Sequence, residues 1–278
     1  LMNYILESHD HQNICFAGGV SLNSVVMGKM FDWFPDKNLY VTPTPHDGGL
    51  TLGAAQYTWH HILNNPRIKW EDNFSPYLGF SYDNISAEKK KYKDKVKFKK
   101  VKDSDVVELL SKQNIVAVFG GGSESGRRAL GNRSILADPR SPDMKAIINE
   151  KVKHRQWFRP FAPSILREEV KNWFIQDRPS PYMSFVLQFK ESVKDKVPAV
   201  VHIDGSARLQ TVTENDNKWY YNFIKEWHKK TDVPILLNTS FNDREPICET
   251  PEHAINCFLK TEIDYLYFYD KNILVERK

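Results

Sequence analysis

Short apolar runs alternate with longer amphipathic segments along most of the 278-residue chain. Short apolar runs bounded by Gly, Pro or Asn are typical of buried strands, whereas apolar residues that recur every three or four positions indicate helices. The pattern predicts strands at 13–17, 39–42, 115–119, 184–189, 208–212 and 234–237, and a hairpin or edge strand at 265–276. It predicts helices at 21–30, 50–63, 103–112, 142–153, 166–174, 216–230 and 251–260. Strands that alternate with helices indicate the α/β class.

A polar segment divides this pattern in two. Residues 64–86 are rich in Asn, Pro, Ser and Tyr, which is typical of a linker. The part before it holds two strand–loop–helix units, which are too few to enclose a complete core. We therefore expect a partial domain at 1–70 and a complete domain at 71–278. The chain opens at Leu1 without a Met or an apparent leader, and we expect it to be a fragment of a longer protein.

The composition is 41% hydrophobic and 27% charged, which excludes disorder throughout the chain. No run approaches the roughly 18 apolar residues of a membrane span, so no membrane partner is expected. Three widely spaced cysteines argue against a zinc site or a disulfide framework and for a cytoplasmic protein: Cys15, Cys248 and Cys257. The sequence leaves the oligomeric state open.

The net charge of +4 is unevenly distributed. Residues 88–102 hold nine lysines against Glu88 and Asp94, so the rest of the chain carries −3. One patch on a slightly acidic protein is more typical of a solvated face than of a nucleic-acid-binding surface. Nucleic acid is therefore not the expected partner.

Seven of the twelve arginines lie between Arg127 and Arg167, where they interleave with glycines and prolines. A guanidinium recognises phosphate or carboxylate through paired hydrogen bonds, and lysine adds a point charge. These residues follow an apolar strand and the glycine turn at 120–122, a setting that suits a polyphosphate pocket. The alternative is a network of surface salt bridges.

Lys153, Arg155 and Arg159 add spacing information. In an extended segment Lys153 and Arg155 lie on the same side, where two cations repel unless an anion sits between them. The aromatic and proline residues at 157–163 should bury this segment. The alternative is a solvated basic edge.

Small polar residues follow the apolar run at 234–237. Because α/β folds place ligands at strand ends, Asn238, Ser240 and Asn242 are candidates for ligand binding. Ser240 and Asn242 alternate, so both can point at one ligand while Phe241 faces the core. A turn capped by Asn and Ser is the alternative.

Two loops of the first part precede predicted helices, whose free N–H groups favour anions. Gly18 and Gly19 form the first turn, and Asp47 lies in the second loop. Asp47 either caps the following helix or ligates a metal or substrate, and capping is favoured on spacing alone. No nucleophile motif is present, so positioning and charge neutralisation are the expected chemistry.

Six segments together resemble the O-carbamoyltransferase family, which includes nodulation-type enzymes and enzymes that carbamoylate antibiotics. The segments are GGVSLN at 18–23, HDGGLTLGAA at 46–55, SGRRALGNRSILADPR at 125–140, KHRQWFRPFAPSIL at 153–166, DGSARLQTV at 204–212 and LLNTSFN at 236–242. They occur in order over nearly the whole chain, so the resemblance is far more specific than a single short motif.

The resemblance implies a YrdC-like twisted-sheet domain at 71–278, preceded by the C-terminal remnant of an actin-like ATPase-fold domain at 1–70. It implies that the YrdC-like domain forms carbamoyl-adenylate from carbamoyl phosphate and ATP, with release of pyrophosphate. The actin-like domain would transfer the carbamoyl group to an acceptor hydroxyl with iron(II) or a similar divalent metal. Magnesium is expected to accompany ATP.

The resemblance also assigns roles to residues. Lys153-x-Arg155 resembles the KxR motif of YrdC-like domains, and Ser240-x-Asn242 resembles their SxN motif, which implies nucleotide contact. It implies that four basic residues hold the phosphates: Arg128, Lys153, Arg159 and Arg208. In the first part, Asp47 resembles the metal-ligating Asp, and the nucleotide-binding loop is represented by Gly18, Gly19 and Asn23.

The chain departs from the family pattern in three places. Arg127 stands where the family usually has Pro, and the loop FNDREPI after Phe241 is one residue shorter than usual. The family's HxxxH metal motif and the acceptor-binding region belong upstream of Leu1, so we expect the chain to be incomplete as a transferase. The alternatives are an RNA-binding YrdC-like module that uses the lysine run, and a catalytically degenerate nucleotide-binding protein.

Overall fold

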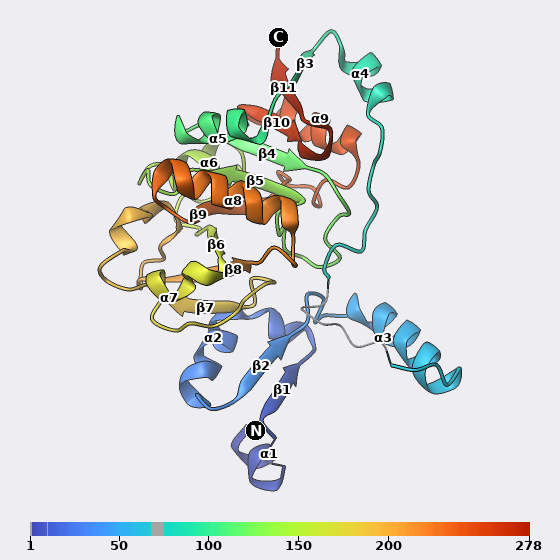
Figure 1. The fold of residues 1–278 in the computed structure, drawn as a ribbon, viewed down its shortest axis with the longest axis vertical. Helices are drawn as coiled ribbons and strands as arrows, with labels where there is room; N and C mark the ends of the chain where they lie inside the picture. Colours follow the sequence, from blue (N-terminus) through green and yellow to red (C-terminus); the bar gives the residue numbers. More distant parts are fainter. Residues whose placement is uncertain (1, 10, 68–74) are drawn as a thin grey trace.

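The computed structural model describes residues 2–9, 11–67 and 75–278, and this part of the chain contains a two-stranded and a nine-stranded sheet (Figure 1). The nine-stranded sheet is mixed and twisted, with the order β3-β11-β10-β4-β5-β9-β6-β8-β7. Its strands are β3 (Val96–Lys100), β4 (Val116–Phe119), β5 (Arg133–Ala137), β6 (Ala162–Leu166), β7 (Phe185–Gln188), β8 (Ser206–Val212), β9 (Ile235–Ser240), β10 (Tyr265–Phe268) and β11 (Ile273–Arg277). The predicted α/β class with a twisted sheet is confirmed.

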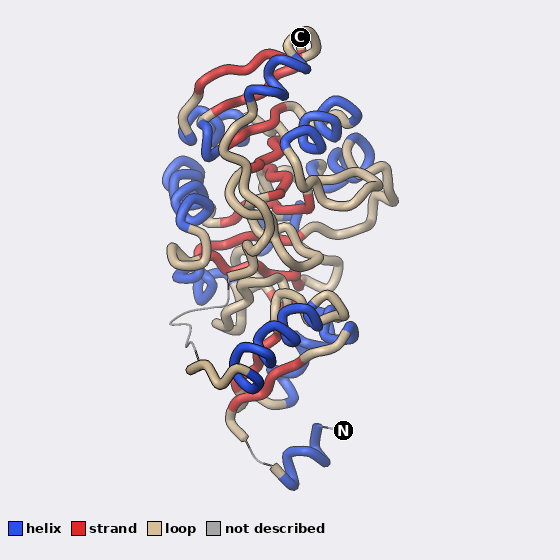
Figure 2. The backbone as a smooth tube through the Cα atoms, turned by 90° about the vertical axis from the view of Figure 1, so that its right-hand side faces the viewer, coloured by secondary structure: helices blue, strands red, loops and turns tan. Residues whose placement is uncertain are grey.

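Helices cover both faces of the large sheet (Figure 2). They are α4 (Ser86–Tyr92), α5 (Asp103–Ser111), α6 (Met144–Lys151), α7 (Val170–Trp173), α8 (Lys218–Thr231) and α9 (Pro251–Lys260). Side chains alternate across each strand, so Val116 and Val118 pack with α5 and α8, whereas Ala117 and Phe119 pack with α9. The core is therefore two apolar layers with the sheet between them.

The first part of the chain contains the two-stranded sheet. Its elements are α1 (Met2–Ser8), β1 (Asn13–Phe16), α2 (Ser24–Trp33), β2 (Asn38–Val41) and α3 (Gly49–Tyr57), which continues as a π-helix over Thr58–Ile62. β1 and β2 pair in parallel. The predicted boundary at residue 70 lies outside the described residues.

The two parts are joined where α2 packs on β7, an edge strand of the large sheet (Figure 1). Gly28 allows this close approach, because a Cβ there would lie 2.0 Å from the carbonyl oxygen of Val186. The rings of Phe31 and Phe185 contact each other with centroids 4.7 Å apart. The helix of the first part thus covers an edge that would otherwise be exposed.

The first part contributes to the core of the large sheet rather than enclosing one of its own. Its buried apolar residues Met27, Phe31 and Val41 join the core of the large sheet, whereas α1 and α3 bury none of their described residues. Many large apolar side chains of this part are exposed, among them Tyr4, Val20, Val25, Trp33, Leu50, Tyr57, Trp59, Ile62 and Leu63. A two-stranded sheet needs further packing to be stable, and parallel strands are normally covered on both faces.

Most predicted elements form within a few residues of their expected bounds, and α9 has the bounds predicted for it. The segment 265–276 is a hairpin of β10 and β11, although β3 lies outside it at the sheet edge. Strands β3, β5 and β6 were not predicted, because Lys, Arg, Ser and Pro residues interrupt their apolar character. Their formation depends on neighbouring strands rather than on local pattern.

Candidate anion-binding site

The candidate site lies where four strands of the large sheet begin or end together. β6 and β8 run in parallel, β9 is antiparallel to β6, and β5 is antiparallel to β9. The starts of β5, β6 and β8 therefore meet the end of β9. This topology brings together the segments 128–133, 153–161, 202–208 and 238–242, which contain most of the predicted site residues.

Three half-buried arginines form the centre of the site. Arg208 lies on β8, Arg128 in the loop before β5, and Arg155 in the turn after α6. Burial lowers the pKa of Arg208, and the positive charges of Arg128 and Arg155 lower it further. Among the described residues no carboxylate offsets this effect, and the buried Nε of Arg208 has no hydrogen-bond partner. Cations held together without an acid favour an anion between them.

Lys153 ties the two predicted motifs into one unit. It is 6% exposed, and its Nζ donates to the carbonyl oxygens of Ser240 (2.5 Å) and Asn242 (2.7 Å) and to Oδ1 of Asn242 (2.9 Å). Burial and the charge of Arg155 lower the pKa of Lys153 to about 7. Lys153 therefore positions the loop after β9, and its protonated form adds a positive charge to the three arginines. We call Arg128, Lys153, Arg155 and Arg208 the basic cluster.

The prediction that Lys153 and Arg155 share one side of an extended segment is wrong. The chain forms a turn here, with His154 at φ 44°. The two cations still act on each other, because the turn brings both to the same end of the sheet. Trp157 and Phe158 are 71% and 61% exposed and do not bury this segment, whereas Phe161 is 3% exposed and its ring centroid lies 4.8 Å from the Arg155 guanidinium carbon, so the predicted burial holds only in part.

Asn149 on α6 organises this turn and was not singled out in the sequence. It is fully buried, and its Oδ1 accepts from Nε of Arg155 at 2.7 Å. Its Nδ2 donates to the carbonyl oxygens of Trp157 (3.0 Å) and Arg159 (2.9 Å). The Arg159 side chain is exposed, so Arg159 borders the basic cluster through a loop that Asn149 holds. A buried Asn next to a basic motif is the signal that sequence reasoning missed.

Other arginines of the 127–167 region have carbonyl or carboxylate partners within the protein, although the buried Nε of Arg133 also lacks a hydrogen-bond partner. The fully buried Arg133 donates to the carbonyl oxygens of Gly120 (2.6 Å) and Gly121 (3.3 Å). Arg140 pairs with Asp138, and Arg167 pairs with Asp177. The glycine turn at 120–122 is therefore filled by Arg133 rather than open to phosphate, which corrects the interpretation drawn from its sequence.

The polar residues at the end of β9 divide into a buried and an accessible set. Asn238 is 1% exposed, and its Nδ2 donates to Oε1 of Gln210 (2.9 Å), to Oγ of Ser164 (3.1 Å) and to the carbonyl oxygen of Ala129 (3.2 Å). Asn238 therefore supports the loop that carries Arg128. Ser240 and Asn242 are half-buried and lie nearer the surface, as the alternating pattern predicts.

The glycine loop of the first part lies beside the basic cluster. Gly18 has φ 95°, a conformation that favours glycine, and nothing lies within 4 Å of a Cβ built at Gly18 or Gly19. Oδ1 of Asn23 accepts from the Val26 N–H (3.3 Å), so Asn23 caps α2. Arg128 donates to the carbonyl oxygen of Leu22 at 3.4 Å. Arg128 thus connects the loop of the first part to the site of the second.

Asp47 does not belong to a metal centre in the part of the chain that the structure describes. Its side chain is exposed, and α3 begins with Gly48 as N-cap without a side-chain capping bond. Across residues 2–9, 11–67 and 75–278, no three His, Cys, Asp or Glu side chains lie close enough to hold an ion. Asp47 is the only predicted iron(II) ligand among the described residues, so no chemical step is assigned to a metal.

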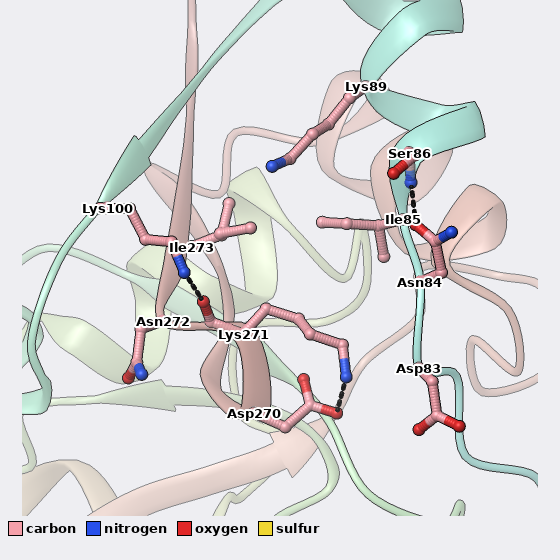
Figure 3. Close-up of a pocket in the computed structure, with 10 residues that line it drawn as sticks. All are labelled: Asp83, Asn84, Ile85, Ser86, Lys89, Lys100, Asp270, Lys271, Asn272 and Ile273. Atoms are coloured by element: carbon pink, nitrogen blue, oxygen red, sulfur yellow. Dashed lines mark hydrogen bonds and ion pairs between the residues drawn. The ribbon is translucent and has the colours of Figure 1, made fainter.

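The lysine run lies on α4 and β3, away from the basic cluster. Four strands separate β3 from β9, about 24 Å at the usual strand spacing. A pocket beside the run has walls of both charges, and in it Lys271 pairs with Asp270 at 3.3 Å (Figure 3). Lysines on an edge strand discourage pairing with the strands of other chains. This effect explains the lysine run, and no ligand is needed to explain it.

No helix in the described ranges is both long and apolar enough to span a membrane.

Fold and site together define the class, an α/β protein with a basic site at one end of its mixed sheet. Residues 107–277 match the family described as Carbamoyltransferase C-terminus, and residues 1–56 match Carbamoyltransferase N-terminus. The chain therefore belongs to the carbamoyltransferase family, as the resemblance indicated.

Curated relatives agree with this assignment. An uncharacterised protein of Synechocystis sp., sll1178, is 38% identical over 96% of this chain and 48% of its own length. The nodulation protein NolNO of Sinorhizobium fredii is 38% identical over 95% of this chain and 40% of its own length. The chain spans about half the length of the curated relatives it matches.

Solved structures show a partial likeness. Full-length HypF in its phosphate- and nucleotide-bound form has a TM-score of 0.44 and 20% identity to this chain, and the match covers 60% of this chain and 25% of HypF.

Proposed function

We propose that residues 71–278 bind carbamoyl phosphate and ATP at the basic cluster and form carbamoyl-adenylate for transfer to an acceptor hydroxyl. The observation that carries this proposal is the basic cluster itself, in which Arg208 faces two further guanidinium groups and no acid. Arg140 and Arg167, by contrast, each pair with a carboxylate. Membership of the carbamoyltransferase family supports the choice of substrate.

The reaction brings two anions together, and that requirement explains the charge. Water releases phosphate from carbamoyl phosphate, and an oxygen of the resulting carbamate attacks the α-phosphorus of ATP. A new P–O bond forms there, and the bond to pyrophosphate breaks. Fixed guanidinium groups offset the repulsion between the reactants and the negative charge that develops on the phosphorus oxygens.

We assign the phosphates to Arg128, Arg208 and Arg159, with Lys153 as the residue that holds the loop after β9. Ser240 and Asn242 would contact the nucleotide, because Lys153 fixes both of them at the edge of the cluster. The expected magnesium would accompany ATP as part of the substrate. These residues do not determine which hydroxyl compound accepts the carbamoyl group.

We also propose that residues 1–70 are the C-terminal part of an actin-like domain and that residues 71–278 are the adenylate-forming domain. The shared core between α2 and β7 and the exposed apolar side chains of the first part support this division. In such an arrangement, further strands and helices would cover the exposed apolar surface of α3 and the β1–β2 sheet. The loop of Gly18 and Gly19 would then contribute to the acceptor-side nucleotide site.

Exchange of labelled pyrophosphate into ATP tests the proposed reaction. The 278-residue protein should catalyse exchange only when carbamoyl phosphate is present. Lys153→Ala should lower the rate at least tenfold, because the variant releases the loop that holds Ser240 and Asn242. Lys229→Ala is the matched control, since Lys229 is an exposed lysine on α8, and it should exchange like the parent. Absence of exchange, or equal rates for the parent and Lys153→Ala, would show the proposal to be wrong.

A further inference from the structure

His202 stands at the start of a tight turn that leads into β8. Its N–H donates to the Ser206 carbonyl oxygen (2.8 Å), and the Gly205 N–H donates to the His202 carbonyl oxygen (3.0 Å). Ser206 and Arg208 lie on the same face of β8, because side chains alternate along a strand. The His202 ring contacts the Ser206 hydroxyl, and the charge of Arg208 acts on it. The imidazole therefore lies beside the basic cluster, on the Arg208 side of the sheet.

Hydrogen bonds determine which ring nitrogen of His202 carries the proton. Oγ of Ser206 lies 2.6 Å from Oδ1 of Asp204 and 3.2 Å from Nδ1 of His202. A carboxylate only accepts, so the single hydroxyl proton of Ser206 is donated to Asp204. Oγ must then accept from an Nδ1–H group. In the neutral ring, Nε2 is left with its lone pair.

The surroundings of His202 favour the neutral form of its ring. Burial lowers the pKa of His202, and the charges of Arg208 and Lys145 lower it further, whereas Asp204 opposes them. Nε2 makes no hydrogen bond with any residue that the structure describes. His202 thus offers an acceptor without a partner next to Arg208.

The side chains of the basic cluster can only donate hydrogen bonds. Arginine and charged lysine carry no acceptor, so these side chains satisfy the oxygen atoms of an anionic substrate and nothing else. Carbamoyl phosphate also carries an amide NH2 group, which is a donor and needs an acceptor. A site without one would leave this group unpaired and would not distinguish it from a methyl group.

We propose that Nε2 of His202 accepts a hydrogen bond from the carbamoyl NH2 group and so selects carbamoyl phosphate over acyl phosphates that lack an amide. The inference rests on the proposed function, because it takes carbamoyl phosphate as the ligand of the basic cluster. His202 is then a specificity residue. Asp204 and Ser206 are positioning residues, since they keep the proton on Nδ1.

Three probes separate this role from general anion binding. Isothermal titration at pH 7 would measure the affinity of the parent and of His202→Leu for carbamoyl phosphate, acetyl phosphate and inorganic phosphate. Acetyl phosphate carries a methyl group in place of the amide. We expect His202→Leu to bind carbamoyl phosphate about five- to tenfold more weakly, the effect of one hydrogen bond, with the other two affinities unchanged. His202→Gln should keep the preference for carbamoyl phosphate, because its side-chain oxygen is also an acceptor.

The outcomes separate this inference from the proposed function. An equal loss of affinity for all three probes in His202→Leu, or an unchanged preference for carbamoyl phosphate over acetyl phosphate, overturns the role of His202. If the parent binds none of the three probes, the proposed function itself fails. Should His202→Leu not fold, His202→Asn replaces it, because its shorter side chain withdraws the acceptor. The preference for carbamoyl phosphate over acetyl phosphate should then be kept in His202→Gln and lost in His202→Asn. The reverse result would overturn the inference.

Discussion

Replacing Arg208 with methionine should stabilise the anion-free protein while it weakens anion binding. Arg208 is repelled by Arg128 and Arg155, and its Nε lacks a hydrogen-bond partner among the described residues. Methionine keeps much of the side-chain volume and removes the charge. Effects of opposite sign on stability and on binding are expected of a residue retained for a ligand.

The size of the effect follows from the pKa of Arg208, which falls from 12.5 to about 9. This shift corresponds to about 5 kcal/mol of unfavourable free energy for the charged form. The side chain is only half-buried and solvent screens part of the repulsion, so we expect the free energy of unfolding to increase by about 1–3 kcal/mol. In a protein of this size, the melting temperature would rise by roughly 2–10 °C.

Thermal unfolding in a buffer free of phosphate and sulfate measures the effect on stability, and addition of phosphate measures binding. Phosphate should raise the melting temperature of the parent and should raise that of Arg208→Met much less. Arg277→Met is the matched control, because Arg277 donates to the carbonyl oxygens of Phe258, Thr261 and Ile263. Its melting temperature should fall while its response to phosphate is retained. A lower melting temperature for Arg208→Met together with a full phosphate response would refute the reasoning.

Two further predictions concern stability. Because the pKa of Lys153 is about 7 in the folded protein against 10.5 in the unfolded chain, the folded protein binds fewer protons between these pH values. The free energy of unfolding, measured by urea titration, should therefore rise with pH more steeply in the parent than in Lys153→Met. The difference should reach up to about 1.4 kcal/mol per pH unit, and equal slopes in the two proteins would contradict the prediction. Gly28→Ala should lower the free energy of unfolding by roughly 1–3 kcal/mol, because the added Cβ would clash with the Val186 carbonyl oxygen. Gly53→Ala on α3 should raise it by up to about 1 kcal/mol, because nothing lies within 4 Å of a Cβ at this helical position. If the urea midpoints of the two alanine variants shift in the same direction, close packing of α2 on β7 does not determine the effect of Gly28→Ala on stability.

Local chemistry explains why much of the secondary structure was predictable. α9 begins at Pro251, Thr250 caps it through a bond from the His253 N–H, and one face of the helix is apolar. Each of these signals lies within the helix or next to it. β5 is different, because it carries the fully buried Arg133, whose partners include carbonyl oxygens of Gly120 and Phe80. A strand of this kind forms only when distant segments supply those partners.

The sequence by itself determined the α/β class, the family, and the segments that carry the site, because residue types and spacings record them directly. Only the tertiary structure decided which basic residues remain available to a ligand. Arg133 has carbonyl partners and Arg140 and Arg167 have carboxylate partners within the protein, whereas Arg208 lies among cations from other segments. The physical reason is that the neighbours of a charged side chain decide whether it is neutralised or free to bind an anion. Those neighbours come from strands far apart in the chain. The availability of Nε2 on His202 likewise depends on a hydrogen-bonded turn that no motif records.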